Sequence, residues 1–130
     1  MTQSPNIRIG IFGGSGYGGS ELLRILLFHP NAELVFVTAN EQAGKPVGEV
    51  HRNLNGLTNL SFVKDPEDLS DIDCVFLALP HGQAMDIVPR LPGNVKAIDL
   101  SGDFRLRIHR RMWKFVVLFE DALIAKSKVA

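Results

Sequence analysis

The start of the chain constrains the fold most, because a strand, a glycine-rich turn and a helix follow one another there. Residues 6–12 are rich in β-branched side chains and predict a short strand, and residues 13–19 read Gly-Gly-Ser-Gly-Tyr-Gly-Gly. Residues 20–28 place leucines at helical spacing, and Pro30 ends that helix because proline disfavours helical geometry in the residue before it. A second β-branched run, residues 33–38, completes one β-α-β unit, whose strands are parallel.

The rest of the chain continues this alternation. Residues 39–59 are polar and predict a long loop with at most short helical turns. Beyond it we expect a short strand over 60–64, a brief helix over 65–69, a strand over 73–79, a helix over 82–88 and a strand over 95–100. The strand over 73–79 is apolar on both faces, as in sheets that are covered on both sides. The pattern therefore predicts an α/β fold, a Rossmann-like doubly wound parallel sheet with helices on both faces.

Composition excludes several classes of protein. The 130 residues include 14 Lys+Arg, 14 Asp+Glu and 45% hydrophobic residues, which is typical of a globular domain. We find neither a membrane-spanning apolar run nor a secretory signal, and we expect a cytoplasmic protein that does not bind membranes. A lone cysteine, Cys74, excludes an internal disulfide, and no cluster has metal-ligand spacing. Residues 105–130 hold 7 basic and 2 acidic side chains, but this basic stretch is too short to indicate nucleic-acid binding.

The glycine-rich turn carries the strongest functional signal. Gly14, Gly16 and Gly19 satisfy the G-x-G-x-x-G pattern, and the pattern lies between a strand and a helix, where dinucleotide binding requires it. Glycines let a pyrophosphate approach backbone N–H groups, and the helix N-terminus attracts its negative charge. The alternative is a turn that serves only close packing of the strand and the helix. The candidate cofactor residues here are Gly13, Gly14, Ser15, Gly16, Tyr17 and Gly19.

The end of the second strand bears on the choice of cofactor. An NAD-preferring site usually has an acid there, but this strand ends in Thr38-Ala39-Asn40. We therefore favour NADP(H), with NAD(H) as the alternative, and include Thr38 and Asn40 among the cofactor residues. Glu33 lies at the wrong end of the strand. Lys45 is the nearby basic residue, either as a ligand of the 2′-phosphate or as an ordinary solvated lysine.

Four segments are informative as a set: Gly13-Gly-Ser-Gly-Tyr-Gly-Gly-Ser-Glu-Leu-Leu-Arg24, Ala43-Gly-Lys-Pro-Val47, Leu77-Ala-Leu-Pro-His-Gly82 and Ile98-Asp-Leu-Ser-Gly-Asp-Phe-Arg-Leu106. Together they resemble N-acetyl-gamma-glutamyl-phosphate reductase. The resemblance implies NADPH-dependent reduction of an acyl phosphate to an aldehyde in arginine biosynthesis, by a nucleotide domain that precedes a separate catalytic domain. Similar reductases act on aminoadipyl phosphate in lysine biosynthesis, and the sequence leaves that choice open.

The resemblance also assigns positions to single residues. It implies that Pro80 and His81 lie near the cofactor, although His81 could equally bond to nearby backbone. Ser101, Asp103 and Arg105 match a family segment, and we interpret them as structural hydrogen-bonding residues. In this family the reaction runs through a cysteine thiolate in an Asn-Pro-Gly-Cys-type segment. This chain has neither that segment nor the later acid-base histidine, and burial makes Cys74 a poor substitute, so we assign no catalytic residue.

Beyond the resemblance lies a segment of different character. We divide the chain into a dinucleotide-binding domain of semialdehyde dehydrogenase type, residues 1–106, and a divergent basic and apolar tail, residues 107–130. An amphipathic helix is plausible in the tail, although residues 115–119 suit a strand as well. The tail suggests a truncated or altered reading frame, or a surface that docks on a second copy or on a complementing catalytic chain. Three hypotheses follow: an incomplete cofactor domain, half of a split reductase, or a non-enzymatic remnant.

Overall fold

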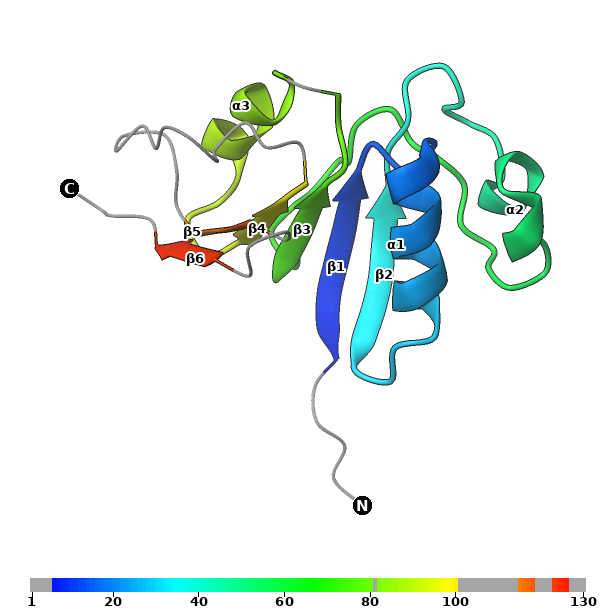
Figure 1. Ribbon diagram of the computed structural model, residues 1–130, viewed down its shortest axis with the longest axis horizontal. Helices are drawn as coiled ribbons and strands as arrows, with labels where there is room; N and C mark the ends of the chain where they lie inside the picture. The colour runs from blue at the N-terminus through cyan, green and yellow to red at the C-terminus, as the bar shows by residue number, and fades with distance from the viewer. Residues whose placement is uncertain (1–5, 81, 101–114, 119–122, 127–130) are drawn as a thin grey trace.

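The strands form one sheet in the order β2-β1-β3-β4-β5-β6 (Figure 1). The structure is a computed structural model, which describes residues 6–80, 82–100, 115–118 and 123–126. Strands β2, β1, β3, β4 and β5 are mutually parallel, and β6 pairs antiparallel with β5. The bounds are β1 Ile7–Phe12, β2 Ala32–Val37, β3 Cys74–Leu77, β4 Lys96–Asp99, β5 Phe115–Leu118 and β6 Leu123–Lys126.

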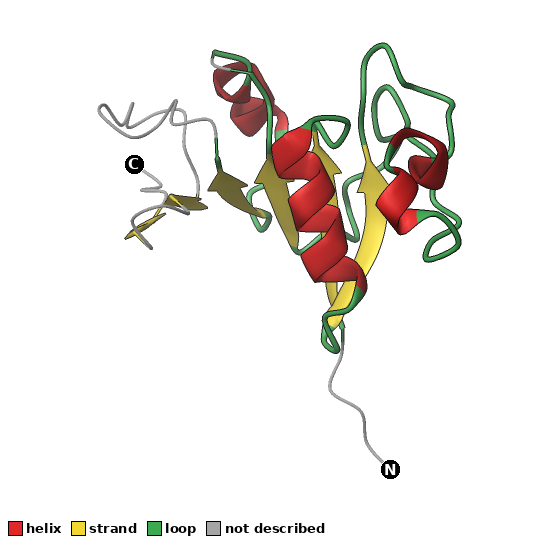
Figure 2. Cartoon of the chain, turned by 45° about the vertical axis from the view of Figure 1, so that its right-hand side comes forward, coloured by secondary structure: helices red, strands yellow, loops and turns green. Residues whose placement is uncertain are grey.

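Helices cover both faces of this sheet, as the sequence predicts. Helix α1, Tyr17–Leu27, packs with one set of strand residues, and α3, Ala84–Ile87, packs with the other set. Successive side chains of β1 point to opposite faces of the sheet, so Ile11 belongs to the cluster under α1 and Phe12 to the cluster under α3. Figure 2 shows α1 lying along one face of the sheet. The expected Rossmann-like architecture is therefore confirmed.

The strand predicted over residues 60–64 does not form. Only isolated bridges occur there, one between Thr38 and Val63 and one between Pro46 and Ser61. Both partners of this segment lie outside regular strands, since β2 ends at Val37 and Pro46 lies just before α2, Val47–Val50. The segment therefore has no continuous strand beside it with which to build a ladder.

The brief helix predicted over residues 65–69 is also wrong. The Asp68 carboxylate accepts hydrogen bonds from the Ser70 backbone N–H at 2.9 Å and from its hydroxyl at 3.0 Å. Such side-chain bonds to nearby backbone compete with helical hydrogen bonds. The same two bonds lower the pKa of the Asp68 carboxyl. The acidic run that suggested a first helical turn thus forms a local turn closed by its own side chain.

Element boundaries differ from expectation in informative places. Helix α1 begins at Tyr17, inside the glycine motif, and ends before Pro30 as predicted. The long loop contains only α2 and the 3-10 turn η1, Arg52–Leu54, which confirms that prediction. The helix predicted over 82–88 is reduced to α3 and a second 3-10 turn, η2, Val88–Arg90, in which Pro89 cannot supply a helical N–H.

The tail contributes strands where the structure describes it. Residues 115–118 form β5, so in this part the strand alternative is correct and the helical one is not. Strand β6 lies at the edge of the sheet. Residues 101–114, which include the candidates Ser101, Asp103 and Arg105, lie outside the described residues. In the described part of the chain, no helix has the length and apolar character to cross a bilayer.

Candidate functional site

The glycine loop connects β1 to α1 and is tied to the end of β2. Gly13 has φ +84°, a left-handed conformation that glycine adopts without steric cost, and an added Cβ would lie 2.6 Å from the Ala78 carbonyl oxygen. The Gly13 N–H donates to Thr38 Oγ1 at 3.0 Å, and the Gly14 N–H donates to the Thr38 carbonyl at 2.8 Å. These bonds place the loop at the carboxyl ends of two parallel strands.

The glycines of the motif have different roles. An added Cβ at Gly14 would meet the Val37 side chain, and one at Gly19 would meet the Gly14 backbone. These two positions are therefore required for close packing of α1 on the sheet. Gly16 is different, because an added Cβ there would meet nothing within 4 Å. Packing does not explain a glycine at this position, whereas a ligand that approaches the backbone would.

The N-terminus of α1 offers hydrogen-bond donors to such a ligand. Its N-cap is Gly16, no side chain caps the helix, and no acidic residue lies in the first turn. The N–H groups of Gly13 and Gly14 are already bonded to Thr38. The donors that remain begin at Ser15 and run into the first helical turn, where the partial positive charge of the helix favours an anion.

A cavity of about 620 Å³ opens beside this loop, at the carboxyl ends of β1, β2 and β3. In parallel α/β sheets, ligands bind at this edge. The cavity brings together five of the candidate residues that the sequence predicts: Gly13, Ser15, Thr38, Asn40 and Pro80. A neighbouring hollow of about 470 Å³ is lined by Ser15, Gly16 and Tyr17, so the two hollows meet at Ser15.

Three of the candidates, Gly14, Gly19 and Thr38, are buried. Gly14 and Gly19 are buried and line neither hollow. His81 lies outside the described residues. Thr38 is buried, with 5% of its surface exposed, and its hydroxyl accepts the bond from Gly13. Thr38 therefore shapes the loop directly.

Sequence reasoning missed His51, which lies beside the glycine loop. Its Nε2 is 2.7 Å from the Gly14 carbonyl oxygen, across 37 positions of sequence. A carbonyl only accepts, so this nitrogen carries the proton. The His51 ring also packs edge-on against Phe62, with ring centroids 5.9 Å apart. A histidine in a long polar loop gives no local signal of such a contact.

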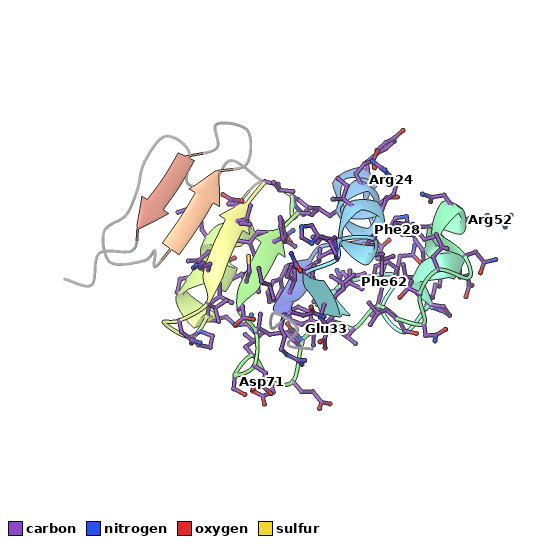
Figure 3. All side chains as sticks on the ribbon, turned by 90° about the horizontal axis from the view of Figure 1, so that it is seen from below. Arg24, Phe28, Glu33, Arg52, Phe62 and Asp71 are labelled. Carbon is purple, nitrogen blue, oxygen red and sulfur yellow. The ribbon has the colours of Figure 1, made fainter. Side chains whose placement is uncertain are left out.

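Glu33 and Lys45, the two charged residues that bear on the choice between NAD and NADP in the sequence, lie away from the cavity. Glu33 pairs with Arg8 at 2.7 Å. Glu33, labelled in Figure 3, is the second residue of β2, which confirms that it lies at the wrong end of its strand. Lys45 does not line the cavity. Lys64 does line it, together with Asn40, because residues 61–63 run beside the end of β2. Nearness in sequence to the end of the second strand favours Lys45 instead.

Cys74 does not have the properties of a reactive thiol. It lies at the start of β3, half-buried, at the end of the strand opposite the glycine loop. Burial raises the pKa of its thiol to about 11. The thiolate is the nucleophilic form, so this cysteine is almost entirely unreactive near neutral pH.

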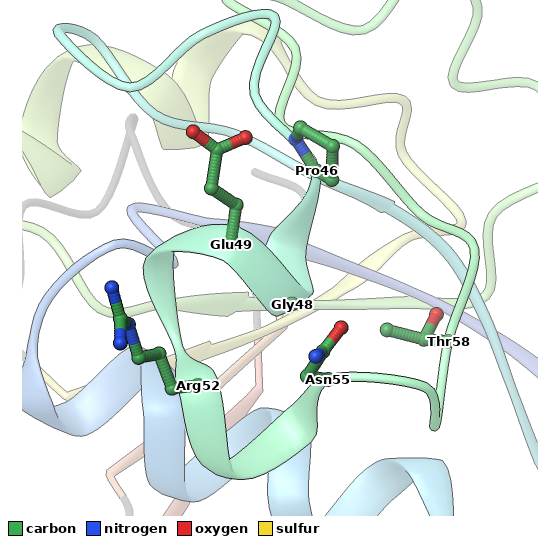
Figure 4. A pocket seen from close by; sticks show the side chains of 6 residues that line it. All are labelled: Pro46, Gly48, Glu49, Arg52, Asn55 and Thr58. Atoms are coloured by element: carbon green, nitrogen blue, oxygen red, sulfur yellow. The ribbon is translucent and has the colours of Figure 1, made fainter.

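A further hollow of about 430 Å³ lies on the segment of α2 and η1 and contains none of the candidate residues. It is lined by Pro46, Gly48, Glu49, Arg52, Asn55 and Thr58. Figure 4 shows Asn55 and Thr58 facing one another, while the charged ends of Glu49 and Arg52 point away. The charged groups of Glu49 and Arg52 are therefore not directed into this hollow.

The largely parallel sheet is covered on both faces, a glycine loop lies at the N-terminus of the first helix, and a cavity lies at the strand ends. These features define a nucleotide-binding domain of Rossmann type. Residues 8–124 match the family described as semialdehyde dehydrogenase, NAD binding domain, and the chain belongs to this family.

Named relatives support the same assignment. The chain is 52% identical over 103 residues to N-acetyl-gamma-glutamyl-phosphate reductase of Methanosarcina barkeri, covering 77% of this chain and 31% of the relative. It is 52% identical over 101 residues to a putative [LysW]-L-2-aminoadipate/[LysW]-L-glutamate phosphate reductase of Pyrococcus horikoshii, covering 78% and 30%. The chain thus spans about a third of the length of these relatives.

The solved structures agree on the fold. Aspartate semialdehyde dehydrogenase with NADP from Candida albicans matches with a TM-score of 0.63 at 20% identity, covering 78% of this chain and 31% of that one. The resemblance to the reductases, which the four sequence segments indicated, is confirmed over the nucleotide-binding domain.

Proposed function

We propose that this chain binds NADP(H) as the cofactor domain of a reductase that converts an acyl phosphate to an aldehyde. The observation that carries the proposal is the open space at Gly16, at the uncapped N-terminus of α1. There the unbonded N–H groups beginning at Ser15 would receive the pyrophosphate. The ribose and base would then extend along the cavity toward Asn40 and Pro80. His81 stays a candidate on the sequence motif alone.

The substrate class follows from the relatives. Their names describe reduction of N-acetyl-gamma-glutamyl phosphate or of aminoadipate and glutamate phosphates carried on LysW. We propose the first substrate, in arginine biosynthesis in the cytoplasm, because the four sequence segments resemble that reductase. The second remains the alternative, since the relatives of both names are equally similar.

We propose that this chain supplies cofactor binding and that the reacting cysteine lies outside it. Its one cysteine, Cys74, is half-buried with a raised thiol pKa and lies at the wrong end of the sheet. The nucleophile would belong to the part of the relatives that this chain does not span, or to a complementing chain. Residues 107–130 are the proposed contact, and their β6 lies at the sheet edge, where backbone groups can pair with another strand.

Titration of the chain with NADPH and NADH, followed by cofactor fluorescence, tests this function. Gly16→Val places a branched side chain in the open space and should abolish saturable binding while the chain stays folded. Gly93→Val is the matched control, because Gly93 is equally open but lies outside the glycine loop and lines neither hollow. Absence of binding by the folded wild-type chain would overturn the proposal and favour the remnant hypothesis.

A further inference from the structure

The segment that contains Lys64 lies beside the end of β2. Val63 forms a parallel bridge with Thr38, the Ala39 N–H donates to the Val63 carbonyl at 3.0 Å, and the Val63 N–H donates to the Val37 carbonyl at 3.0 Å. These bonds fix two distant parts of the chain in register. Lys64 therefore emerges at the same edge of the sheet as Asn40, although 24 positions separate the two numbers.

This edge is where the adenosine ribose of a dinucleotide lies when its pyrophosphate is at the glycine loop. Lys64 lines the 620 Å³ cavity with Asn40, Gly13 and Ser15, so it shares one space with both the loop and the end of β2. Its side chain is exposed, and it makes no hydrogen bond or ion pair with any other residue that the structure describes. Its ammonium group is therefore available to a ligand.

The charges around the cavity make this lysine decisive. Among the described residues that line the cavity, Glu41, Asp65 and Asp86 are acidic and Lys64 alone is basic. The negative charge of Asp65 is partly compensated by Arg90, whose guanidinium nitrogen lies 3.8 Å from a carboxylate oxygen of Asp65. Without Lys64, a 2′-phosphate would enter a space whose charged lining side chains, among the described residues, are all acidic. Lys45 does not replace it, because Lys45 lies outside the lining, where its carbonyl accepts the Phe62 N–H at 2.9 Å.

We infer that Lys64 selects NADP(H) over NAD(H) by binding the 2′-phosphate of the adenosine ribose. This inference rests on the proposed function, since it concerns the same cavity. NAD-preferring sites carry an acid at the end of the second strand. In this chain, a cation from a different segment, Lys64, would take the place of that acid beside the ribose. Lysine binds phosphate as a point charge, so the contact requires nearness to the ribose and no fixed geometry.

The experiment compares ligands that differ only in the 2′-phosphate. Wild type, Lys64→Gln, Lys64→Arg and the matched control Lys45→Gln are titrated with NADPH and NADH, and with adenosine 2′,5′-bisphosphate and AMP. Lys64→Gln should weaken binding of NADPH and the bisphosphate by about 5- to 20-fold and leave NADH and AMP unchanged. Lys64→Arg should retain most of the preference, and Lys45→Gln should bind as wild type does.

Several results would overturn the inference. An equal loss of NADPH and NADH binding in Lys64→Gln would mean that Lys64 affects the site without reading the phosphate. Loss of the preference in Lys45→Gln would assign the phosphate to Lys45. A wild-type chain that binds NADH as tightly as NADPH would exclude selection by Lys64 while the proposed function stands. A wild-type chain that binds neither cofactor would refute the proposed function itself.

Discussion

His51 donates a hydrogen bond from Nε2 to the carbonyl oxygen of Gly14 at 2.7 Å, and so joins the long loop after β2 to the turn that precedes α1. The Gly14 carbonyl and the Ser15 N–H belong to one peptide unit and point in opposite directions. Holding the carbonyl therefore also orients the N–H that we assign to the pyrophosphate. The Gly14 N–H is fixed separately by Thr38.

Removing this bond should weaken cofactor binding. We expect His51→Ala to raise the Kd for NADPH by about 3- to 10-fold, which corresponds to a hydrogen bond worth roughly 0.5–1.5 kcal/mol. His51→Gln keeps an N–H donor and should recover part of the affinity, while Arg52→Ala, at the next position, serves as the control. Fluorescence titration of the four proteins measures the effect. Equal binding by His51→Ala and wild type would show that the loop holds its shape without the histidine.

Gly18 and Gly19, two neighbouring glycines in the first turn of α1, should respond oppositely to substitution by alanine. Gly19→Ala places a Cβ against the Gly14 backbone and should lower the free energy of unfolding by about 1–3 kcal/mol. Gly18→Ala meets nothing, lies in the first turn of α1 and should raise that free energy by up to about 1 kcal/mol. Urea denaturation of both variants provides the comparison. If Gly19→Ala were as stable as wild type, α1 would have to pack less closely than described.

Glu33 should affect stability slightly and cofactor choice not at all. Its ion pair with Arg8 joins side chains that are 49% and 38% exposed, so Glu33→Gln should cost less than about 1 kcal/mol. The ratio of NADPH to NADH affinity should stay unchanged, because Glu33 is far from the carboxyl end of β2. Glu41→Gln, inside the cavity, is the contrasting variant and should improve NADPH binding by removing a negative charge. A changed ratio in Glu33→Gln would contradict this placement.

Cys74 gives the chain a specific dependence on alkaline pH. Burial raises its thiol pKa from 9.0 to about 11, so the folded chain resists losing this proton more than the unfolded chain does. The resulting stabilisation is fully present below about pH 9 and is lost as the pH rises toward 11. Stability measured between pH 8 and 10.5 should therefore fall more steeply in wild type than in Cys74→Ala. Parallel curves for the two proteins would show that the thiol titrates normally.

Local sequence predicts the first β-α-β unit well because its signals are local. The strand at Ile7–Phe12, the glycine turn and the stop before Pro30 each depend on neighbouring residues. The brief helix over 65–69 was wrong for a reason equally local, since the Asp68 side chain captured the Ser70 N–H. Helix propensity and turn formation compete in such short acidic segments, and the outcome depends on geometry that composition does not encode.

In the candidate site as well, residues with a local sequence signal could be predicted and residues that reach the site through long-range contacts could not. The glycine motif and the end of the second strand predict Gly13, Ser15, Thr38 and Asn40 as candidates, and all four line the cavity. His51 and Lys64 were not predicted, although both lie at the site. They reach it through long-range contacts made by the loop that follows β2, and no periodicity or motif in a single sequence encodes such a contact.

Strand β1 lies between β2 and β3, and its second neighbour, β3, arrives late in the sequence. The Arg8 backbone N–H bonds to the Asp73 carboxylate across 65 positions, at the amino end of the paired strands. During synthesis, the ribosome must therefore extend the chain beyond Asp73 before β1 has partners on both sides. Until then the glycine turn is attached to a sheet edge, so we expect cofactor affinity to appear only after most of the domain has been translated.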